Sequence, residues 1–375
     1  MKKAIVLLVL IVVCLVFVSC SKQDYESFNT FDYFSTVITF NALDSKNADV
    51  NTAWEDMKVS LSAMESYLST YVEGSDIDKF NKAEPNSMIE ISKLTYEVLT
   101  LAKSAYVKTG GLYNPAMYLL SDLWGFTDRF TTSSYTPTEP YDRSNPKEQL
   151  PEDKYVDAFM SIIDFSKVLV YMTDGKYFIY KPTDYVEVDG HTYTMKLDLG
   201  GIVKGYAAAI LKQSADNNSV SYGYISLGSS SLALLKRDTS GKSWELKLKD
   251  PCDPNSYYIS SLKKSVFIST SGNYEQYYEI NGKRYCHIID PTTGRPIESG
   301  MLSCTLAFDF GLNDITHSTL IDAYSTALMT MNIDDAIAFV NDKGLTAYIA
   351  IKDGEKNKVY TNDGSANILA NYERI

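Results

Sequence analysis

Hydrophobic residues recur at helical spacing in several stretches of the chain. Trp54, Met57, Leu61 and Leu68 lie three, four or seven residues apart, which places them on one face of a helix from Val50 to Thr70. The same spacing predicts further helices over Ser92–Thr109, Ile202–Gln213, Thr319–Met331 and Asp334–Lys343. The chain is therefore expected to contain at least this set of amphipathic or buried helices.

Shorter stretches, rich in β-branched and aromatic residues, predict strands between these helices. Their expected bounds are Phe34–Phe40, Val168–Met172, Tyr177–Lys181, Tyr193–Asp198, Tyr222–Leu227, Leu232–Leu235, Trp244–Lys249, Ser265–Ser269, Tyr277–Ile280, Tyr285–Ile289, Leu302–Phe308 and Thr346–Ile351. Helices and strands alternate without an internal repeat or a long linker. The pattern predicts an α+β fold, with mixed sheets flanked by helices in one large domain over residues 31–375, and a surface loop at residues 131–153.

The first nineteen residues have the pattern of a secretory signal. Lys2 and Lys3 precede an apolar run from Ala4 to Val18 that is too short to span a bilayer. Ser19-Cys20 resembles the lipobox of bacterial lipoproteins, which implies a palmitate-type acyl chain on Cys20. We expect an exported protein anchored by lipid to a membrane such as the cell inner membrane, on its periplasmic or extracellular face, with residues 20–30 as a tether. The alternative is an uncleaved N-terminal anchor.

The charge and the cysteine content argue against some classes of function. The formal net charge is −12, and removal of residues 1–19 takes away Lys2 and Lys3 but no acid, which makes it −14. This balance argues against nucleic-acid binding. Without Cys14 and an acylated Cys20, three cysteines remain, an odd number whose spacing matches no metal motif, so we expect buried or lightly exposed thiols.

Three segments carry candidate chemistry, and the first runs from Leu197 to Tyr206. A predicted strand ends in Asp198, two glycines permit a tight turn, and a helix follows. Backbone N–H groups and the helix dipole would point at a phosphate over this turn, where Lys204 could neutralise it. The alternative is a packing joint between a strand and a helix, and the spacing of a Walker loop is absent.

The second and third segments contain a histidine and a carboxylate. His287 is one of three histidines and precedes a turn fixed by Asp290-Pro291 and Gly294, where it could move a proton or serve only a structural role. Asp322 and Thr326 are four residues apart on one face of an apolar helix. A carboxylate there needs a partner or a cation, and oxygen ligands suit Mg²⁺. The alternative is that Asp322 bonds a neighbouring backbone group.

In their order along the chain, these segments resemble the FAD:protein FMN transferases, the ApbE-like family of exported flavin-handling lipoproteins. The resemblance rests on Leu68–Asn81, Gly110–Pro115 with Leu123–Phe126, Asp198–Gly205, Thr270–Tyr274, His287–Pro296 and Asp322–Thr326. It covers the chain from about Asp32 to Ile351. It implies an enzyme that binds FAD as substrate with Mg²⁺, transfers the FMN half to a threonine of an exported or membrane-bound redox protein, and releases AMP.

The resemblance also implies a role for each site residue. Asp322, Thr326 and the backbone carbonyl of Gly201 would bind the metal. Asp198 and Lys204 would hold FAD near its ribose and diphosphate, and His287 would contact the diphosphate or assist the incoming hydroxyl. The remaining pocket would be lined by Phe34, Tyr71, Leu112, Tyr113 and Asn114. Acceptors of the family carry a Ser/Thr-Gly-Ala-Thr-like segment, which this chain lacks, so modification in trans is expected.

The chain departs from the family pattern at four places. Ser226–Ser230 replaces an Asn-x-Gly-Gly-Asn segment, Asn273 and Asn114 replace aspartates, and an unusual Asp-Phe-Gly-Leu-Asn-Asp stretch precedes Ser318. These changes keep two alternatives open: an FAD pyrophosphatase that produces FMN and AMP, and a non-catalytic FAD-binding lipoprotein. A surface interaction protein without flavin is a further alternative.

Overall fold

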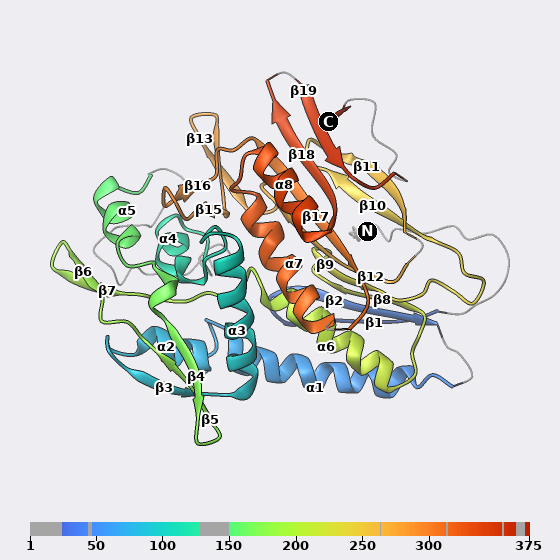
Figure 1. The fold of residues 1–375 in the computed structure, drawn as a ribbon, viewed down its shortest axis with the longest axis horizontal. Coiled ribbons are helices and arrows are strands. Elements are labelled where there is room, and N and C mark those ends of the chain that lie inside the picture. Colours follow the sequence, from blue (N-terminus) through green and yellow to red (C-terminus); the bar gives the residue numbers. More distant parts are fainter. Residues whose placement is uncertain are drawn as a thin grey trace, which may run out of the picture.

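The computed structural model describes residues 25–43, 47–127, 150–262, 264–312, 314–354, 356–364 and 372–375. Its largest element is a nine-stranded sheet with the order β1-β2-β8-β9-β12-β17-β18-β19-β20 (Figure 1). All neighbours in this sheet are antiparallel except β19 and β20. The strands are β1 Tyr25–Tyr33, β2 Thr36–Leu43, β8 Gly223–Leu227, β9 Ser231–Leu234, β12 Val266–Gly272, β17 Met301–Asp309, β18 Thr346–Asp353, β19 Lys356–Thr361 and β20 Tyr372–Arg374.

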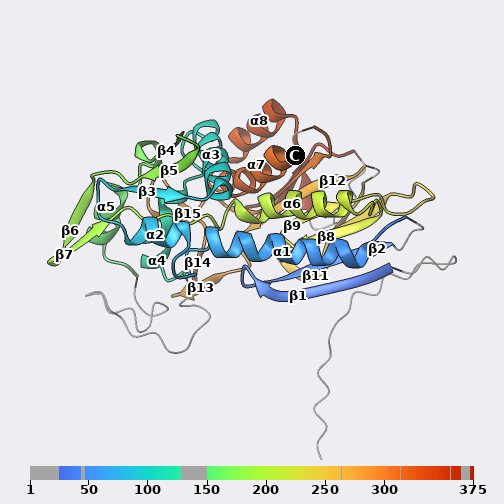
Figure 2. The same cartoon turned by 90° about the horizontal axis from the view of Figure 1, so that it is seen from below.

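Helices cover one face of this sheet. They are α1 Val50–Leu68, α6 Val203–Asn217, α7 Asp314–Leu328 and α8 Ile333–Lys343. Helix α3 Lys93–Lys108 packs on α7 beside them. Helices α1 and α6 run side by side, and α7 packs on α6, β12 and β17 (Figure 2). Phe267 of β12 and Leu306 of β17 point into the core beneath the helices. Their neighbours Ile268 and Ala307 point to the other face, as side chains along a strand must.

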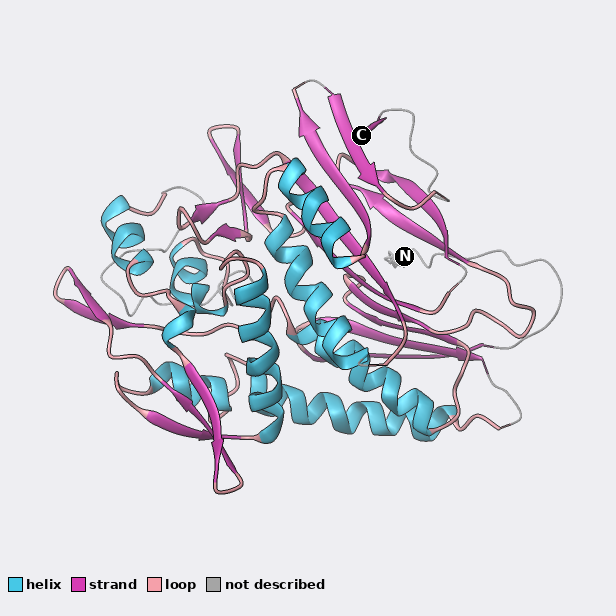
Figure 3. Ribbon diagram, in the orientation of Figure 1, coloured by secondary structure: helices cyan, strands magenta, loops and turns pink. Residues whose placement is uncertain are grey.

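A hairpin covers part of that other face. Its strands are β10 Trp244–Asp250 and β11 Asp253–Leu262. Trp244, Leu246 and Leu262 pack on the cluster that contains Ile268, and Leu248 packs on a second cluster around Val359. The strands of the sheet and hairpin thus lie on one side of the molecule, and most helices lie on the other (Figure 3).

Smaller elements extend the molecule beyond α3. A three-stranded sheet has the order β3-β5-β4, and β6 pairs with β7. The bounds of this region are α2 Asp76–Lys82, β3 Met88–Ile91, η1 Pro115–Met117, α4 Tyr118–Leu123, α5 Asp153–Met160, η3 Phe165–Lys167, β4 Leu169–Thr173, β5 Lys176–Tyr180, β6 Tyr185–Val188 and β7 His191–Thr194. Two further hairpins are β13 Tyr277–Ile280 with β14 Lys283–Cys286, and β15 Ile289–Asp290 with β16 Arg295–Pro296.

The predicted mixture of helices and sheets in one domain is confirmed. The expected tether is wrong in its second half, because residues from Tyr25 onward form β1, paired with β2. The strand expected up to Asp198 ends at Thr194, the strand expected over Tyr285–Ile289 is interrupted at His287, and α7 starts at Asp314. Cys20 and most of the expected 131–153 loop lie outside the described residues, and α5 begins at Asp153.

The described cysteines agree with expectation, because Cys286 and Cys304 are buried thiols and Cys252 is an exposed one. Within the described part of the chain, no helix combines the length and apolar character that crossing a bilayer requires.

Candidate active site

The structure brings all eleven predicted site residues into the wall of one cavity of about 410 Å³. They come from the β1–β2 turn, the segment after α1, the stretch before η1, the start of α6, the β14–β15 connection and α7. The residues are Phe34, Tyr71, Leu112, Tyr113, Asn114, Asp198, Gly201, Lys204, His287, Asp322 and Thr326. A neighbouring chamber of about 260 Å³ shares Phe34, Tyr71, Asp198 and Lys204 with this cavity.

Asp198 is held from both sides in the chain before α6. Its backbone N–H donates to Pro115 O at 2.8 Å, and Asn81 exchanges two side-chain hydrogen bonds with the backbone of Leu197. Its Oδ1 accepts from Gly200 N at 2.8 Å. Burial raises the pKa of Asp198, and this bond and the charge of Lys204 oppose the rise.

The turn before α6 differs from the expected row of free N–H groups. Ile202 N and Val203 N donate to Leu199 O, and Gly205 N donates to Asp322. Three donors of the predicted phosphate cradle are therefore already bonded within the protein. The remaining positive group is Lys204, whose Nζ donates to Gly200 O at 3.3 Å at the cavity wall.

Asp322 is buried at the centre of a hydrogen-bond network that joins α6, α7 and the main sheet. Oδ2 accepts from Gly205 N at 2.9 Å, and Oδ1 accepts from Ser269 Oγ at 2.7 Å and Ser231 Oγ at 3.3 Å. Only glycine fits at position 205, because a Cβ there would lie 2.4 Å from Ser318 O and 2.6 Å from Asp322 Cβ. The close approach of α6 and α7 thus fixes the carboxylate.

Thr326 and Tyr113 lie against Gly201. A Cβ built on Gly201 would lie 3.5 Å from Thr326 Oγ1 and 3.4 Å from Cε2 of Tyr113. Thr326 Oγ1 makes only long contacts, 3.4 Å to Asp322 O and 3.3 Å to Ser271 Oγ. The buried hydroxyl of Tyr113 has no hydrogen-bond partner among the described residues. Burial, aided by Asp322 and Asp198, raises its pKa well above the usual value, so it stays protonated.

This set of donors fits a hard cation. A carboxylate offers about four lone-pair sites, and Asp322 uses three of them. Thr326 and the Gly201 carbonyl would add two more oxygens, a ligand type that Mg²⁺ prefers while it keeps places for phosphate and water. No group of three or more His, Cys, Asp or Glu side chains suited to a metal occurs within the described ranges, so the site depends on hydroxyl and carbonyl oxygens.

His287 is arranged as a proton acceptor. Its backbone N–H and ring Nδ1 both contact Gln276 O, at 3.0 and 3.3 Å. A carbonyl oxygen only accepts, so Nδ1 carries the hydrogen and Nε2 keeps a free lone pair. Burial, together with the charge of Lys204, lowers the pKa of His287 to about 4. The ring is therefore neutral near pH 7.

Phe34 reaches the cavity from a strained turn. Phe34 and Ser35 link β1 to β2 with φ values of 53° and 49°, a conformation that asparagine and glycine usually supply. The backbone N–H of Phe34 donates to Glu65 Oε2 at 2.9 Å, which helps to hold the turn. A bulky residue kept in this conformation at a cavity wall indicates a functional constraint.

Asn114 and Asn273, where the sequence resemblance leads us to expect aspartates, both have structural roles. Asn114 accepts from Ala116 N and donates to Ile163 O, each at 2.9 Å, so its side chain caps η1. Asn273 donates to Met301 O at 2.9 Å, which a carboxylate could not do. Both amides thus donate a hydrogen bond that a carboxylate could not donate.

Several residues around the predicted set were missed by the sequence reasoning. Ser231, Ser269, Ser271 and Ser325 surround Asp322 and Thr326, and Gly205 permits the α6–α7 contact. The Thr-Ser-Gly-Asn motif at the end of β12 was a signal for Ser271. Ser231 of β9 and Ser325 of α7 belong to no sequence motif, so nothing in the sequence distinguishes them from other small residues.

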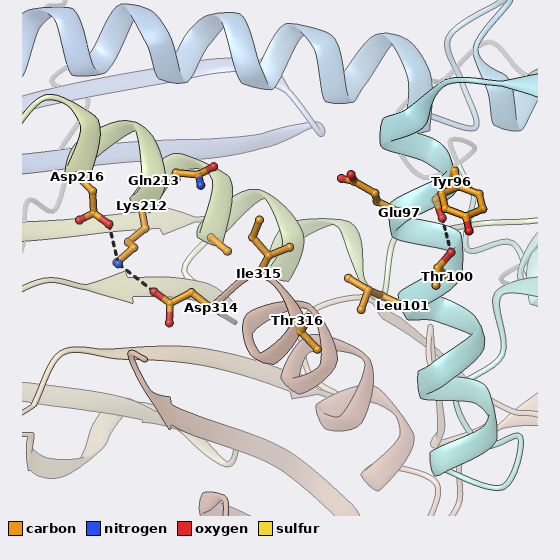
Figure 4. A pocket seen from close by; sticks show the side chains of 11 residues that line it. Tyr96, Glu97, Thr100, Leu101, Lys212, Gln213, Asp216, Asp314, Ile315 and Thr316 are labelled. Atoms are coloured by element: carbon orange, nitrogen blue, oxygen red, sulfur yellow. Dashed lines mark hydrogen bonds and ion pairs between the residues drawn. The ribbon is translucent and has the colours of Figure 1, made fainter. Parts of the chain in front are cut away.

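A larger cavity of about 540 Å³ lies elsewhere, between α3, α6 and the start of α7 (Figure 4). Three of its four charged residues are paired with one another, because Lys212 contacts Asp216 at 2.7 Å and Asp314 at 2.9 Å. It contains none of the predicted site residues. The site with a neutral histidine and an oxygen cluster is the better candidate for chemistry.

Comparison with known proteins shows the family of this chain. Residues 34–349 match the model of the ApbE family. This chain belongs to the ApbE family. It is 27% identical over 314 residues to the FAD:protein FMN transferase of Escherichia coli K12, covering 82% of this chain and 78% of that protein. It is 24% identical to the FAD:protein FMN transferase of Haemophilus influenzae over 94% of both chains.

Two solved ApbE structures share the fold. The flavin transferase ApbE of Vibrio cholerae superposes with a TM-score of 0.71 at 21% identity, over 90% of this chain and 97% of the other. The flavinyl transferase ApbE of Pseudomonas stutzeri, in its apo form, gives 0.72 at 20% identity, over 92% and 96%. The predicted ApbE-like fold is thus confirmed over most of the chain.

Proposed function

We propose that this ApbE-family protein transfers the FMN half of FAD to a hydroxyl group of a partner protein. The observation that carries the proposal is the convergence of Lys204, His287 and Asp322 in one cavity. The names of the curated relatives, FAD:protein FMN transferase, support the same activity. Within this proposal FAD is the substrate, a threonine of the partner is the acceptor and AMP is the leaving product.

The walls of the cavity suit the parts of FAD. Phe34 and Tyr71 offer aromatic surface, which is where a flavin or adenine ring would stack. Lys204 would lie against the diphosphate, as the main cationic group at the turn before α6. Asp198, fixed by Pro115 O and Gly200 N, would accept hydrogen bonds from ribose hydroxyls. Positioning of this kind supplies much of the rate acceleration in phosphoryl transfer.

A Mg²⁺ ion would be held by Asp322, Thr326 and the carbonyl of Gly201. When bound, it would offset the negative charge that develops on the diphosphate oxygens. The protein's own contribution is to keep the three oxygen donors in place. Gly205 N–H and Ser269 orient the carboxylate, and the helix holds Thr326 one turn from it.

His287 would take the proton from the acceptor. Its free Nε2 removes the hydrogen of the threonine hydroxyl while that oxygen attacks the phosphorus of the FMN phosphate. The bond from this phosphorus to the oxygen bridging to AMP breaks, and AMP leaves with the electron pair. The products are a phosphoester of the partner, AMP and a proton carried by His287. The flavin is neither oxidised nor reduced.

The location of the protein is part of the proposal. The signal pattern of residues 1–19 and the lipobox resemblance at Cys20 support export and attachment by lipid. Such an anchor would keep the cavity near membrane-bound redox proteins, which are the expected acceptors.

The test uses the full chain with FAD, Mg²⁺ and a soluble acceptor domain that carries a Ser-Gly-Ala-Thr segment. We expect the domain to gain the mass of one FMN while AMP appears in equal amount. Intact FAD and an unmodified domain after long incubation would contradict the proposal. FMN and AMP formed without any acceptor would favour the pyrophosphatase alternative, because the neutral His287 could also deprotonate water. Tight FAD binding without either product would favour a binding protein.

A further inference from the structure

Another cavity, of about 590 Å³, lies between the hairpin β10–β11 and the main sheet, and we call it the second cavity to distinguish it from the active-site cavity. Its floor is formed by Thr270 of β12, Ser303 and Thr305 of β17 and Ala350 of β18. Protein interiors are close-packed, and voids much larger than a water molecule are rare. A space of this size is in the range of about 300–1,000 Å³ that is typical of ligand sites.

The wall of this cavity is the edge of a strand. Four consecutive residues of β10, Leu246 to Lys249, all line it. Side chains alternate between the two faces of a strand, so consecutive residues meet one cavity only where it runs along the strand's edge. Within the ranges that the structure describes, β10 pairs with β11 alone. Its other edge therefore presents backbone donors and acceptors that a further strand could use.

Strand β10 also lies close to the candidate active site. Ser260 of β11 is 2.7 Å from the hydroxyl of Tyr348, which also lines the second cavity. Lys249 Nζ of β10 lies 5.4 Å from the ring centre of Tyr274. Tyr274 is the residue that directly precedes Glu275 in the sequence. The side chain at the end of β10 thus lies beside Tyr274, the neighbour of a residue in the wall of the active-site cavity.

The two cavities are adjacent. Thr270 and Glu275 line both of them, and Ser229 and Ser230 of one turn line the second and the first respectively. The residue after Glu275 is Gln276, whose carbonyl oxygen holds the ring of His287. A chain segment in the second cavity that passes Glu275 therefore arrives at the proton acceptor.

We propose that the acceptor protein binds in this second cavity as an extended segment that adds to the free edge of β10. The proposal rests on the proposed function and names how the acceptor reaches it. Strand addition provides main-chain hydrogen bonds, and pockets beside the strand select side chains. Seven residues of β10 offer a length of about 23 Å. The hydroxyl-lined floor suits small polar side chains, and Lys247 and Lys249 suit an acidic residue on the segment.

Hydrogen–deuterium exchange tests this binding mode without requiring turnover. The probe is the full chain with FAD, alone and with a saturating soluble domain that carries a Ser-Gly-Ala-Thr segment. We expect alternate amides of β10 to exchange at least about tenfold more slowly with the domain. A control domain with proline inside that segment should give no protection, because proline cannot donate to a ladder.

The outcomes separate the two proposals. Protection of β10 without FMN transfer supports the binding mode and counts against the transferase function. FMN transfer without protection of β10 overturns the binding mode and leaves the function intact. If neither protection nor transfer is seen, both proposals fail.

Two substitutions at the floor provide a second measurement. Ser303→Trp fills the cavity from the face of the sheet opposite Asp322, and Ser303→Ala keeps it open. We expect the tryptophan variant to transfer FMN at least about tenfold more slowly, with FAD affinity changed less than about twofold. The alanine variant should match the wild type. Equal transfer rates in a folded tryptophan variant would overturn the proposal, and the exchange experiment decides the case if that variant does not fold.

Discussion

At the scale of single residues, the site depends on how the protein holds one carboxylate. Asp322 is buried, and its oxygens accept from Gly205, Ser269 and Ser231. A buried carboxylate that loses such partners is costly, so the donors are as much a part of the site as the acid itself. Gly205 has two functions here, because it donates one of the bonds and its missing side chain lets α7 approach α6.

The first prediction concerns Gly205→Ala. The added methyl group would lie 2.4 Å from Ser318 O, so α6 and α7 must separate and the bond to Asp322 must lengthen. We expect a loss of about 1–3 kcal/mol in the free energy of unfolding and a slower FAD turnover. Gly311→Ala is the matched control, since nothing lies within 4 Å of a Cβ there. Chemical denaturation of both variants measures the difference, and equal stabilities would contradict the close approach.

The second prediction concerns pH. His287 has a pKa of about 4, below the ordinary value of about 6.5. It therefore accepts a proton at any pH above about 5, and the transfer rate should not fall between pH 8 and pH 5.5 through this group. A rate that halves near pH 6.5 would mean that His287 has an ordinary pKa.

The same shift affects stability. The unfolded chain binds a proton at His287 below about pH 6.5, and the folded chain does so only near pH 4. The unfolded state is thus favoured by acid, so the stability present above pH 6.5 should decrease as pH falls from 6.5 to 4. Replacement by glutamine should remove this part of the pH dependence of unfolding.

The third prediction concerns Asn273. Its amide donates to Met301 O, while its Oδ1 finds no partner in the described structure. Asn273→Asp would lose the donor and place a carboxylate beside a carbonyl oxygen, at a cost of about 1–3 kcal/mol in the free energy of unfolding. Asn29→Asp is the control, because Asn29 only accepts from Thr39 in an exposed position. If both variants unfold at the same denaturant concentration, the structural role of Asn273 is wrong.

At the scale of elements, the sequence predicts those with a clear hydrophobic face and misses those without one. Helices α1 and α3 agree with their expected bounds to within two residues. Strand β1 was taken for part of a tether because it is an edge strand in which Thr30 is the one buried residue among mostly polar neighbours. Helix α7 starts earlier than its apolar pattern, because its first turn contains Asp314, which accepts from Gly311 N and pairs with Lys212.

In the candidate site, too, some residues could be predicted from the sequence and others could not. Residues in motifs, such as Asp198, Lys204 and Thr326, could be named from the sequence together with the resemblance. Their supporting contacts could not, because Ser231, Ser269 and Asp322 meet only when β9, β12 and α7 pack together. The predicted phosphate cradle also failed in part, since the pattern of a glycine turn before a helix does not reveal that Leu199 O already accepts two of its donors.

At the scale of the whole molecule, strand β1 connects the expected lipid anchor at Cys20 with the active-site cavity. Phe34 lines the cavity just after the end of β1, and Tyr25 begins the strand at its other end, about 30 Å away. Four residues, Ser21 to Asp24, separate Tyr25 from Cys20 in the sequence. The proposed lipid would therefore attach near the end of the sheet that is remote from the active site, through a link shorter than the expected tether.

The fourth prediction tests the anchor. Cys20→Ser should remove the acyl mass from the mature protein and release it from membranes into the soluble fraction. The control is Cys252→Ser, because Cys252 is an exposed thiol within the folded domain and is not expected to carry lipid. Mass spectrometry and membrane fractionation measure both effects. A Cys20→Ser protein that stays in the membrane would favour an uncleaved N-terminal anchor.

The most direct test of the central claim is Asp322→Ala, with FAD turnover and its dependence on Mg²⁺ measured in the same assay. If Asp322 holds the cation against the diphosphate, the variant should lose at least about a hundredfold in FMN transfer to the acceptor domain, and added Mg²⁺ should no longer change the rate. Asp157→Ala, an exposed acid on α5, should behave as the wild type. A folded Asp322→Ala protein that transfers FMN at the wild-type rate, with an unchanged response to Mg²⁺, would contradict the account.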